Sequence, residues 1–195
     1  SILVEYSHDG TEDAVLTQLT DINSDGDTVS GNIPYTKHGA HLTINSESGK
    51  VGYFVSGKSS NGSLKIYSLK KFQLMLSGLD LTNPSGPAIN IQTGKTIYFT
   101  IDDNTINYLC DGETYNAPAV ADEDQKGTLF SEGQLVFDGA GTLNITSLGG
   151  HGVCSDDYIR IRSGNINIVQ AAKDGFHTNE KFIVGRTKTA SPTIT

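Results

Sequence analysis

Acidic and amide side chains recur at matching places late in the chain, at spacings of 24 and 23 residues. They are Glu132, then Asp156 and Asp157, and then Asn179 and Glu180. A repeat that stacks its units at the distance between neighbouring strands, about 4.8 Å, brings these side chains together, and carboxylates at that distance repel each other. Calcium prefers such oxygen ligands, so the pattern predicts a calcium site. The alternative is that these turn side chains point into water or pair with Lys181 and Arg160.

A second and weaker calcium pattern lies near the N-terminus. Asp21 to Asp27 reads D-x-N-x-D-G-D, which matches the first half of a calcium-binding loop with Gly26 at its sharp turn. The twelfth position is Asn32 instead of glutamate, and a turn rich in Asp, Asn and Gly explains the same residues. The weaker metal candidates are Asp21, Asn23, Asp25, Asp27, Asp122, Asp124 and Asp174.

One outward-facing position of the repeat carries residue types that suit sugar binding. In order along the chain the row is Tyr67, Gln92, Phe130, Cys154 and His177, with Tyr98, Arg160 and Arg162 on the next strand. An exposed aromatic ring can stack on a sugar ring, and arginine can bind a uronate carboxylate through two parallel hydrogen bonds. The alternative is that an insertion, such as residues 109–128, packs over the aromatic side chains.

Two lysines offer a catalytic alternative. Lys126 and Lys173 fall in adjacent coil register with Gly150 between them, and His151 lies one coil from Asp174. A lysine beside calcium could remove the proton next to a uronate carboxylate, as in a lyase, but solvated lysines explain the same pattern. We find no glycosidase carboxylate pair, nucleophile elbow, phosphate loop or Cys/His zinc pattern. The residues therefore favour binding, with Lys173 or Lys126 as base only if the protein is a lyase.

These side chains meet only if the chain folds as a stack of coils. The leading apolar residues of one strand are Leu42, Phe72, Ile97, Leu135, Ile159 and Phe182, spaced by 30, 25, 38, 24 and 23 residues. A second short strand follows each from Phe72 to Ile159, and no segment between strands has helical periodicity, which excludes a βαβ fold. A β-sandwich stays open, but it does not require the same residue kinds at a fixed interval. We therefore predict an all-β parallel β-helix with coils of about 23–25 residues.

The repeat also suggests how the chain is divided. We expect a single domain over residues 1–195, with an N-terminal cap at 1–32 and coils at 33–195 that are incomplete at the C-terminus. The longest spacing contains an acidic insertion between Tyr108 and Leu129. Long insertions on a rigid scaffold often bind ligands, although a solvated loop accounts for the same composition.

The composition of the chain narrows the classes of partner that it could bind. A net charge of −8 argues against nucleic acid, which requires a basic surface. No apolar run approaches the roughly 18 residues of a membrane span, so we expect no membrane insertion by this segment. The two cysteines, Cys110 and Cys154, lack motif spacing and are expected to be unpaired. The chain begins at Ser1, which favours a mature protein with its signal removed, outside the cell or on its surface.

Several successive coils resemble one known family. The segments GTLFSEGQLVF, HGVCSDDYIRIRSGNINI and AAKDGFHTNEKF are similar to bacterial secreted carbohydrate-binding domain-containing proteins. SLKKFQLMLSGLDLTNPSGPAINIQTGKTIYF resembles earlier coils of that family. The resemblance implies a right-handed parallel β-helix, related in fold to calcium-dependent pectate lyases, that binds pectic or cellulosic polysaccharide with calcium. The open alternatives are a calcium-dependent lyase of uronic-acid polymers and a structural or adhesive surface protein.

Overall fold

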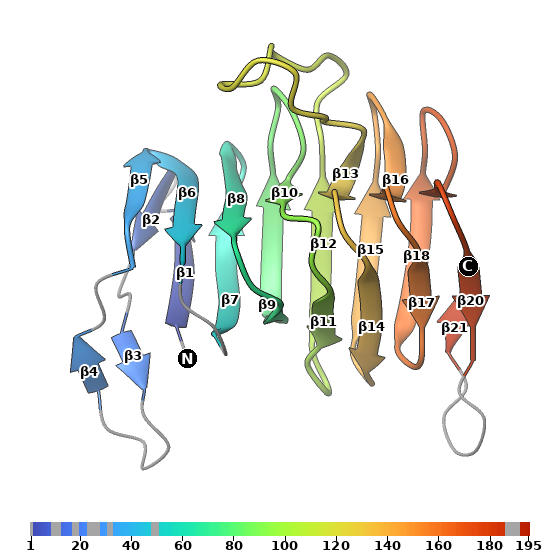
Figure 1. Ribbon diagram of the computed structural model, residues 1–195, viewed down its shortest axis with the longest axis horizontal. Coiled ribbons are helices and arrows are strands. Elements are labelled where there is room, and N and C mark those ends of the chain that lie inside the picture. The colour runs from blue at the N-terminus through green and yellow to red at the C-terminus, as the bar shows by residue number, and fades with distance from the viewer. Residues whose placement is uncertain are drawn as a thin grey trace.

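The computed structural model is an all-β stack of parallel strands, drawn side by side along the long axis of the molecule in Figure 1. It describes residues 2–8, 13–16, 20–22, 28–30, 33–47, 51–185 and 192–195. Each complete coil contributes three strands, one to each of three faces. The prediction of a parallel β-helix is confirmed. The described residues form no helix, and hence no helix that could span a membrane.

Faces 1 and 2 belong to one sheet. Face 1 contains the first halves of β7 (Gly52–Ser59) and β9 (Phe72–Thr82), then β11 (Ile97–Ile101), β14 (Leu135–Gly139), β17 (Ile159–Ile161) and β20 (Phe182–Val184). Face 2 contains the second halves of β7 and β9, then β12 (Ile106–Cys110), β15 (Thr142–Thr146), β18 (Asn165–Gln170) and β21 (Thr193–Ile194). Strand β9 serves both faces because it turns the corner at Gly78, whose φ of 78° suits glycine.

Face 3 is the second sheet. It contains β5 (Tyr35–His38), β6 (Ala40–Ser46), β8 (Gly62–Ser68), β10 (Ile89–Gln92), β13 (Gly127–Ser131), β16 (His151–Ser155) and β19 (Phe176–Thr178). All neighbouring strands of this face are parallel except β5 and β6, which form an antiparallel pair.

The N-terminal residues include a strand of the parallel stack. Strand β1 (Ile2–His8) pairs in parallel with β7 and buries Ile2, Val4 and Tyr6 in the core. The hydroxyl of Tyr6 donates a 2.7 Å hydrogen bond to the carbonyl of Ser63 on face 3. Beyond β1 lie β2 (Asp13–Leu16), β3 (Thr20–Ile22) and β4 (Thr28–Ser30), which pair antiparallel.

The inward residues of each strand form one continuous apolar core. Along face 1 the register joins Phe72, Ile97, Leu135, Ile159 and Phe182, as the spacing predicted. Leu42 was wrongly placed in this row, because it lies on β6 of face 3 and pairs with Leu64. Two residues further into the strands, the rings of Phe99 and Phe137 pack against each other in a tilted arrangement, with centroids 4.9 Å apart and an interplanar angle of 49°. Alternation along each strand thus decides which side chains are buried and which face outward.

The alternation of buried and outward-facing side chains makes a direct prediction about β11. Phe99→Ala should lower the free energy of unfolding by about 3–5 kcal/mol, because it removes a fully buried ring and leaves a cavity. Tyr98→Ala on the same strand is the matched control, since Tyr98 faces outward and is 39 % exposed. Urea denaturation measures both variants. Equal losses from the two substitutions would contradict the assigned alternation.

Candidate functional site

The acidic insertion covers the early coils of face 3. Residues 111–126 form no strand and arch over the top of β10 and β13 in the view of Figure 1. Glu123 of this segment pairs with Lys65 and accepts a hydrogen bond from the Tyr67 hydroxyl. Gln92 donates a 2.9 Å hydrogen bond to the carbonyl of Asp124. We call residues 111–126 the covering loop, since they close this face as the alternative reading expected.

A buried carboxylate anchors the base of the covering loop. Asp111 is 1 % exposed and accepts hydrogen bonds from the hydroxyl of Tyr115 and, at 2.8 Å, from that of Ser147. Burial, and then the bond to Asp111, raises the pKa of Tyr115 far above its ordinary range, so the phenol remains a donor. The loop is therefore fixed at its base as well as at Glu123.

The predicted sugar-binding row on face 3 is wrong. Phe130 is fully buried and pairs with Asn90 and Cys154, whereas Tyr67 pairs with Gln92 one row away. The alignment of coils that the repeat predicted is two residues out of register between β10 and β13. Tyr67 is only partly exposed, beneath Glu123 and within 4.9 Å of the Lys65 ammonium. Phe130 is therefore closed to a sugar, whereas Tyr67 still lines a small cavity of about 230 Å³ beside the covering loop.

The predicted acidic cluster forms in part. The carboxylates of Glu132 and Asp156 converge with that of Asp124 from the covering loop, all within 4.8 Å of one another. Asn179 joins them by donating a 3.2 Å hydrogen bond to Asp156. Asp157 instead accepts a 3.0 Å hydrogen bond from Gln134, and Glu180 is exposed. We call Asp124, Glu132 and Asp156 the acidic cluster.

A lysine neutralises part of the acidic cluster. The Lys126 ammonium lies 2.7 Å from both carboxylate oxygens of Asp156 and 2.8 Å from Asp124, so it is the partner that was expected to be Lys181 or Arg160. Burial disfavours this ammonium, but its hydrogen bonds to the two aspartates outweigh that effect and raise the lysine pKa. The same contacts lower the pKa of Asp124. Burial and the nearby Asp156 raise the pKa of Glu132, whose charge is less well compensated.

The lysines considered as lyase bases lie where the repeat predicted. The backbone of His151 donates to the carbonyl of Lys126 and that of Lys173 donates to the carbonyl of Gly150, which confirms their adjacent coil register. A general base must be neutral, and the raised pKa of Lys126 disfavours its neutral amine. Lys173 is exposed.

Of the remaining weak metal candidates, the structure describes Asp21, Asp122 and Asp174. Asn23, Asp25 and Asp27 lie outside the described residues, and only the backbone of Asp21, in β3, is described. Asp122 is exposed on the covering loop, with a φ of 67°. Asp174 and the sugar-binding candidate His177 lie together at the late end of face 3, beside His151.

Face 1 carries an open groove that contains the other predicted sugar-binding residues. A cavity of about 300 Å³ is lined by Gln73, Tyr98, Thr100, Val136, Asp138 and Arg162. Gln73 donates a 3.1 Å hydrogen bond to Thr100, and Asp138 accepts one of 2.6 Å from Ser163. Arg160 follows Val136 in the row of Tyr98, and its buried Nε has no hydrogen-bond partner among the described residues.

A basic hollow that the sequence patterns did not reveal lies before the start of the same strands. This second cavity of about 450 Å³ is lined by Leu69, Lys70, Lys71, Gly94, Lys95, Thr96 and Gln134. Lys71 is two residues before Gln73, and Lys95 is three before Tyr98, so the second cavity lies at the turns that lead into β9 and β11. The available signal was the register: both lysines come directly before paired strands. We call the two cavities together the face 1 groove.

Comparisons with known proteins agree with this architecture. The gadolinium derivative of a polysaccharide lyase-like protein from C. thermocellum is 14 % identical with a TM-score of 0.67, over 100 % of this chain and 91 % of that one, which shows the shared fold. A carbohydrate-binding domain-containing protein of Acetivibrio thermocellus is 25 % identical over 118 residues. That match is 60 % of this chain and 41 % of the relative, so the chain spans well under half of the relative's length. A family model described as carbohydrate-binding domain-containing protein matches residues 19–190, and the chain therefore belongs to that family.

Proposed function

We propose that this chain is a non-catalytic module that binds polysaccharide along the face 1 groove, outside the cell or at its surface. The observation that carries the proposal is Tyr98, whose ring is exposed on the flat sheet between hydrogen-bonding side chains on neighbouring strands. Such a ring can stack on a sugar, while Gln73 and Thr100 can bond hydroxyl groups. Family membership supports carbohydrate as the ligand class.

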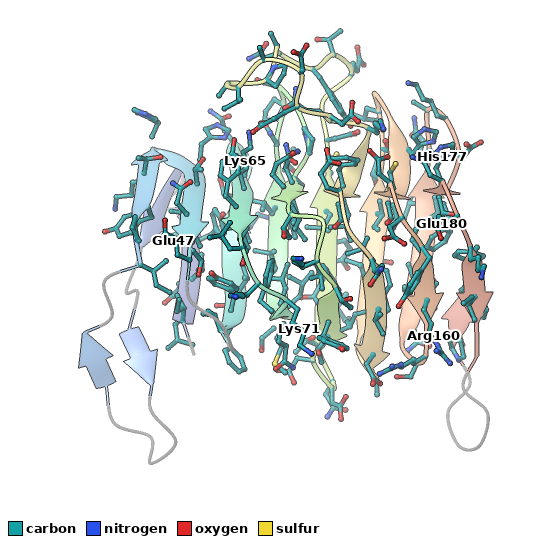
Figure 2. The ribbon with its side chains drawn as sticks, in the orientation of Figure 1. Glu47, Lys65, Lys71, Arg160, His177 and Glu180 are labelled. Carbon is teal, nitrogen blue, oxygen red and sulfur yellow. The ribbon has the colours of Figure 1, made fainter. Side chains whose placement is uncertain are left out.

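The charges along the groove favour an acidic polysaccharide of the pectic kind over a neutral, cellulosic one. The protein has a net charge of −8, yet this groove collects Lys70, Lys71 and Lys95 at one end and Arg162 at the other. In Figure 2, Lys71 and Arg160 both lie toward the lower edge of the molecule. A chain that crosses the groove would meet a cation at each end, and arginine can bind a carboxylate with two parallel bonds.

No contact among the residues that the structure describes favours the lyase or the adhesive alternative over binding. The face 1 groove lacks Lys126 and Lys173, and Lys126 is engaged by two aspartates. Incubation with polygalacturonate and calcium tests the point, because a lyase releases an unsaturated product that absorbs ultraviolet light. Appearance of that product would overturn the non-catalytic proposal.

Tyr98→Ala should weaken binding to polygalacturonate about tenfold, because a stacking contact is worth roughly 1–2 kcal/mol. Affinity electrophoresis or calorimetry gives the dissociation constants. Tyr108→Ala is the matched control, since Tyr108 is also exposed but lies on β12 of face 2. A loss that is equal for both variants, or absent for Tyr98→Ala, contradicts the proposed groove.

The preference for acidic chains has its own test. Lys71→Gln combined with Lys95→Gln should weaken binding to polygalacturonate several-fold more than binding to a neutral glucan, and should reduce the salt dependence of the former. Equal effects on the two polymers would argue for carbohydrate binding without acidic specificity.

We also propose that the acidic cluster binds calcium. Its three carboxylates provide hard oxygen donors of the kind that calcium prefers, and Asn179 adds an amide beside them. The raised pKa of Glu132 indicates that Lys126 alone does not offset the negative charge at this side chain. Calcium would therefore compete with the Lys126 ammonium for Asp124 and Asp156.

Asp156→Ala combined with Asp157→Ala should abolish any calcium-induced rise in melting temperature, whereas Lys126→Met should enlarge it by removing the competing ammonium. Differential scanning fluorimetry with and without calcium measures both effects. Glu47→Ala, at an exposed position on the early part of the chain, is the control and should keep the wild-type response. An unchanged rise in the double variant would place any calcium elsewhere.

In calcium-free buffer, Glu132→Gln should raise the melting temperature at pH 7. The folded protein raises the pKa of Glu132, so the ionised carboxylate lowers stability above that pKa, and this penalty disappears as the pH falls below the ordinary value of 4.5. The gain in melting temperature from Glu132→Gln should therefore be smaller at pH 4 than at pH 7. Glu113→Gln, on an exposed part of the covering loop, is the control. A gain that persists at low pH would exclude this electrostatic cause.

A further inference from the structure

Two histidines and an aspartate converge at the late end of face 3. His151 begins β16, Asp174 lies in the turn before β19, and His177 is the middle residue of β19. Oδ2 of Asp174 is 3.3 Å from Nδ1 of His151 and 3.1 Å from Nδ1 of His177. The two imidazole rings stack with centroids 4.3 Å apart and an interplanar angle of 18°. The three side chains thus come from two adjacent coils and place one possible ligand atom each within 4.8 Å of the others.

The separations between these donor atoms match the edges of a metal tetrahedron. Zinc binds nitrogen and carboxylate oxygen at about 2.0–2.2 Å, which gives ligand-to-ligand edges of about 3.3–3.5 Å in tetrahedral geometry. The two nitrogen-to-oxygen distances are close to this range, and all three donor atoms lie within 4.8 Å of one another. Because the two rings are nearly parallel, a bound ion requires the partly exposed His177 ring to rotate until both imidazole nitrogens face it.

The hydrogen bonds show that His151 can donate a lone pair. The backbone N–H of Asp174 donates a 3.1 Å hydrogen bond to Nδ1 of His151, so this nitrogen is the unprotonated acceptor in the imidazole. A bound ion would replace this single bond. The His151 side chain is only 12 % exposed and is fixed by its surroundings, whereas Asp174 is 61 % exposed. The site is therefore preformed on one side and open to water on the other.

We propose that His151, Asp174 and His177 form a binding site for a transition-metal ion of the zinc class, with a fourth position open to solvent. Two imidazoles and one carboxylate favour zinc, cobalt or nickel, whereas calcium prefers oxygen ligands alone and should select the acidic cluster. Since the ligands join β16 to β19, the ion fastens the last described coil of face 3 to its neighbour. The proposal is independent of carbohydrate binding, because none of its three residues lines either cavity of the face 1 groove; Figure 2 shows His177 above Arg160 at the same end of the stack.

The test uses the full chain after treatment with chelator. Titration with cobalt should produce visible d–d absorption that saturates at one ion per chain, and zinc should bleach it. His177→Gln and Asp174→Asn, both at partly or fully exposed positions, should each lose this signal while the protein stays folded by circular dichroism. His41→Gln is the matched control, since His41 bonds Ser63 and Asn61 on the early coils and should leave the signal unchanged.

The melting temperature is a second readout, because an ion that joins the last described coil to its neighbour should stabilise the fold. Zinc should raise the melting temperature of the wild-type chain and of His41→Gln, because a ligand that binds only the folded state stabilises it, and calcium should not reproduce this effect through the histidine site. Neither His177→Gln nor Asp174→Asn should show the rise with zinc. Absence of cobalt absorption in the wild-type chain, or a signal of wild-type size in either ligand variant, would overturn the proposal.

Discussion

Parallel pairing between successive coils is the constraint on which every other feature depends. Each coil exposes an apolar inward row that it cannot bury alone, and the next coil covers it at the strand spacing of about 4.8 Å. The contact between Phe99 and Phe137 in the core and the bond between Asn179 and Asp156 at a turn have this same origin. The repeat that makes the core continuous also makes outward side chains of adjacent coils into neighbours, whatever their charge.

As a result, the charge of the side chains on one line of turns changes along the stack. From β8 onward, the turns that lead from face 3 into face 1 carry Lys70 and Lys71, then Lys95, then Glu132, then Asp156 and Asp157, and the last described one carries both Glu180 and Lys181. The basic turns border the face 1 groove, where an acidic polymer can approach, and the acidic turns require compensation. Lys126 supplies part of it from the covering loop, and this is why a calcium ion would have a competitor there.

The sequence was sufficient wherever the spacing between coils was regular. The row from Phe72 to Phe182 and the meeting of Glu132, Asp156 and Asn179 were predicted from intervals alone. Tyr67 and Phe130 were misaligned because a slip of two residues preserves the alternation of inward and outward positions, so the apolar pattern does not reveal it. The slip arose across the longest insertion, where the interval between coils carries no information about register.

The covering loop then decides which face can bind a polymer. Its contacts through Glu123 and Asp124 close face 3 above Lys65, Tyr67 and Gln92, whereas no comparable segment among the described residues covers Tyr98 on face 1. Sequence reasoning assigned aromatic residues to both faces with equal justification, since a loop's path depends on tertiary contacts that no local pattern encodes. Tyr98 on face 1 is therefore an exposed ring that the covering loop does not reach, and the cavities of its face carry Lys71, Lys95 and Arg162.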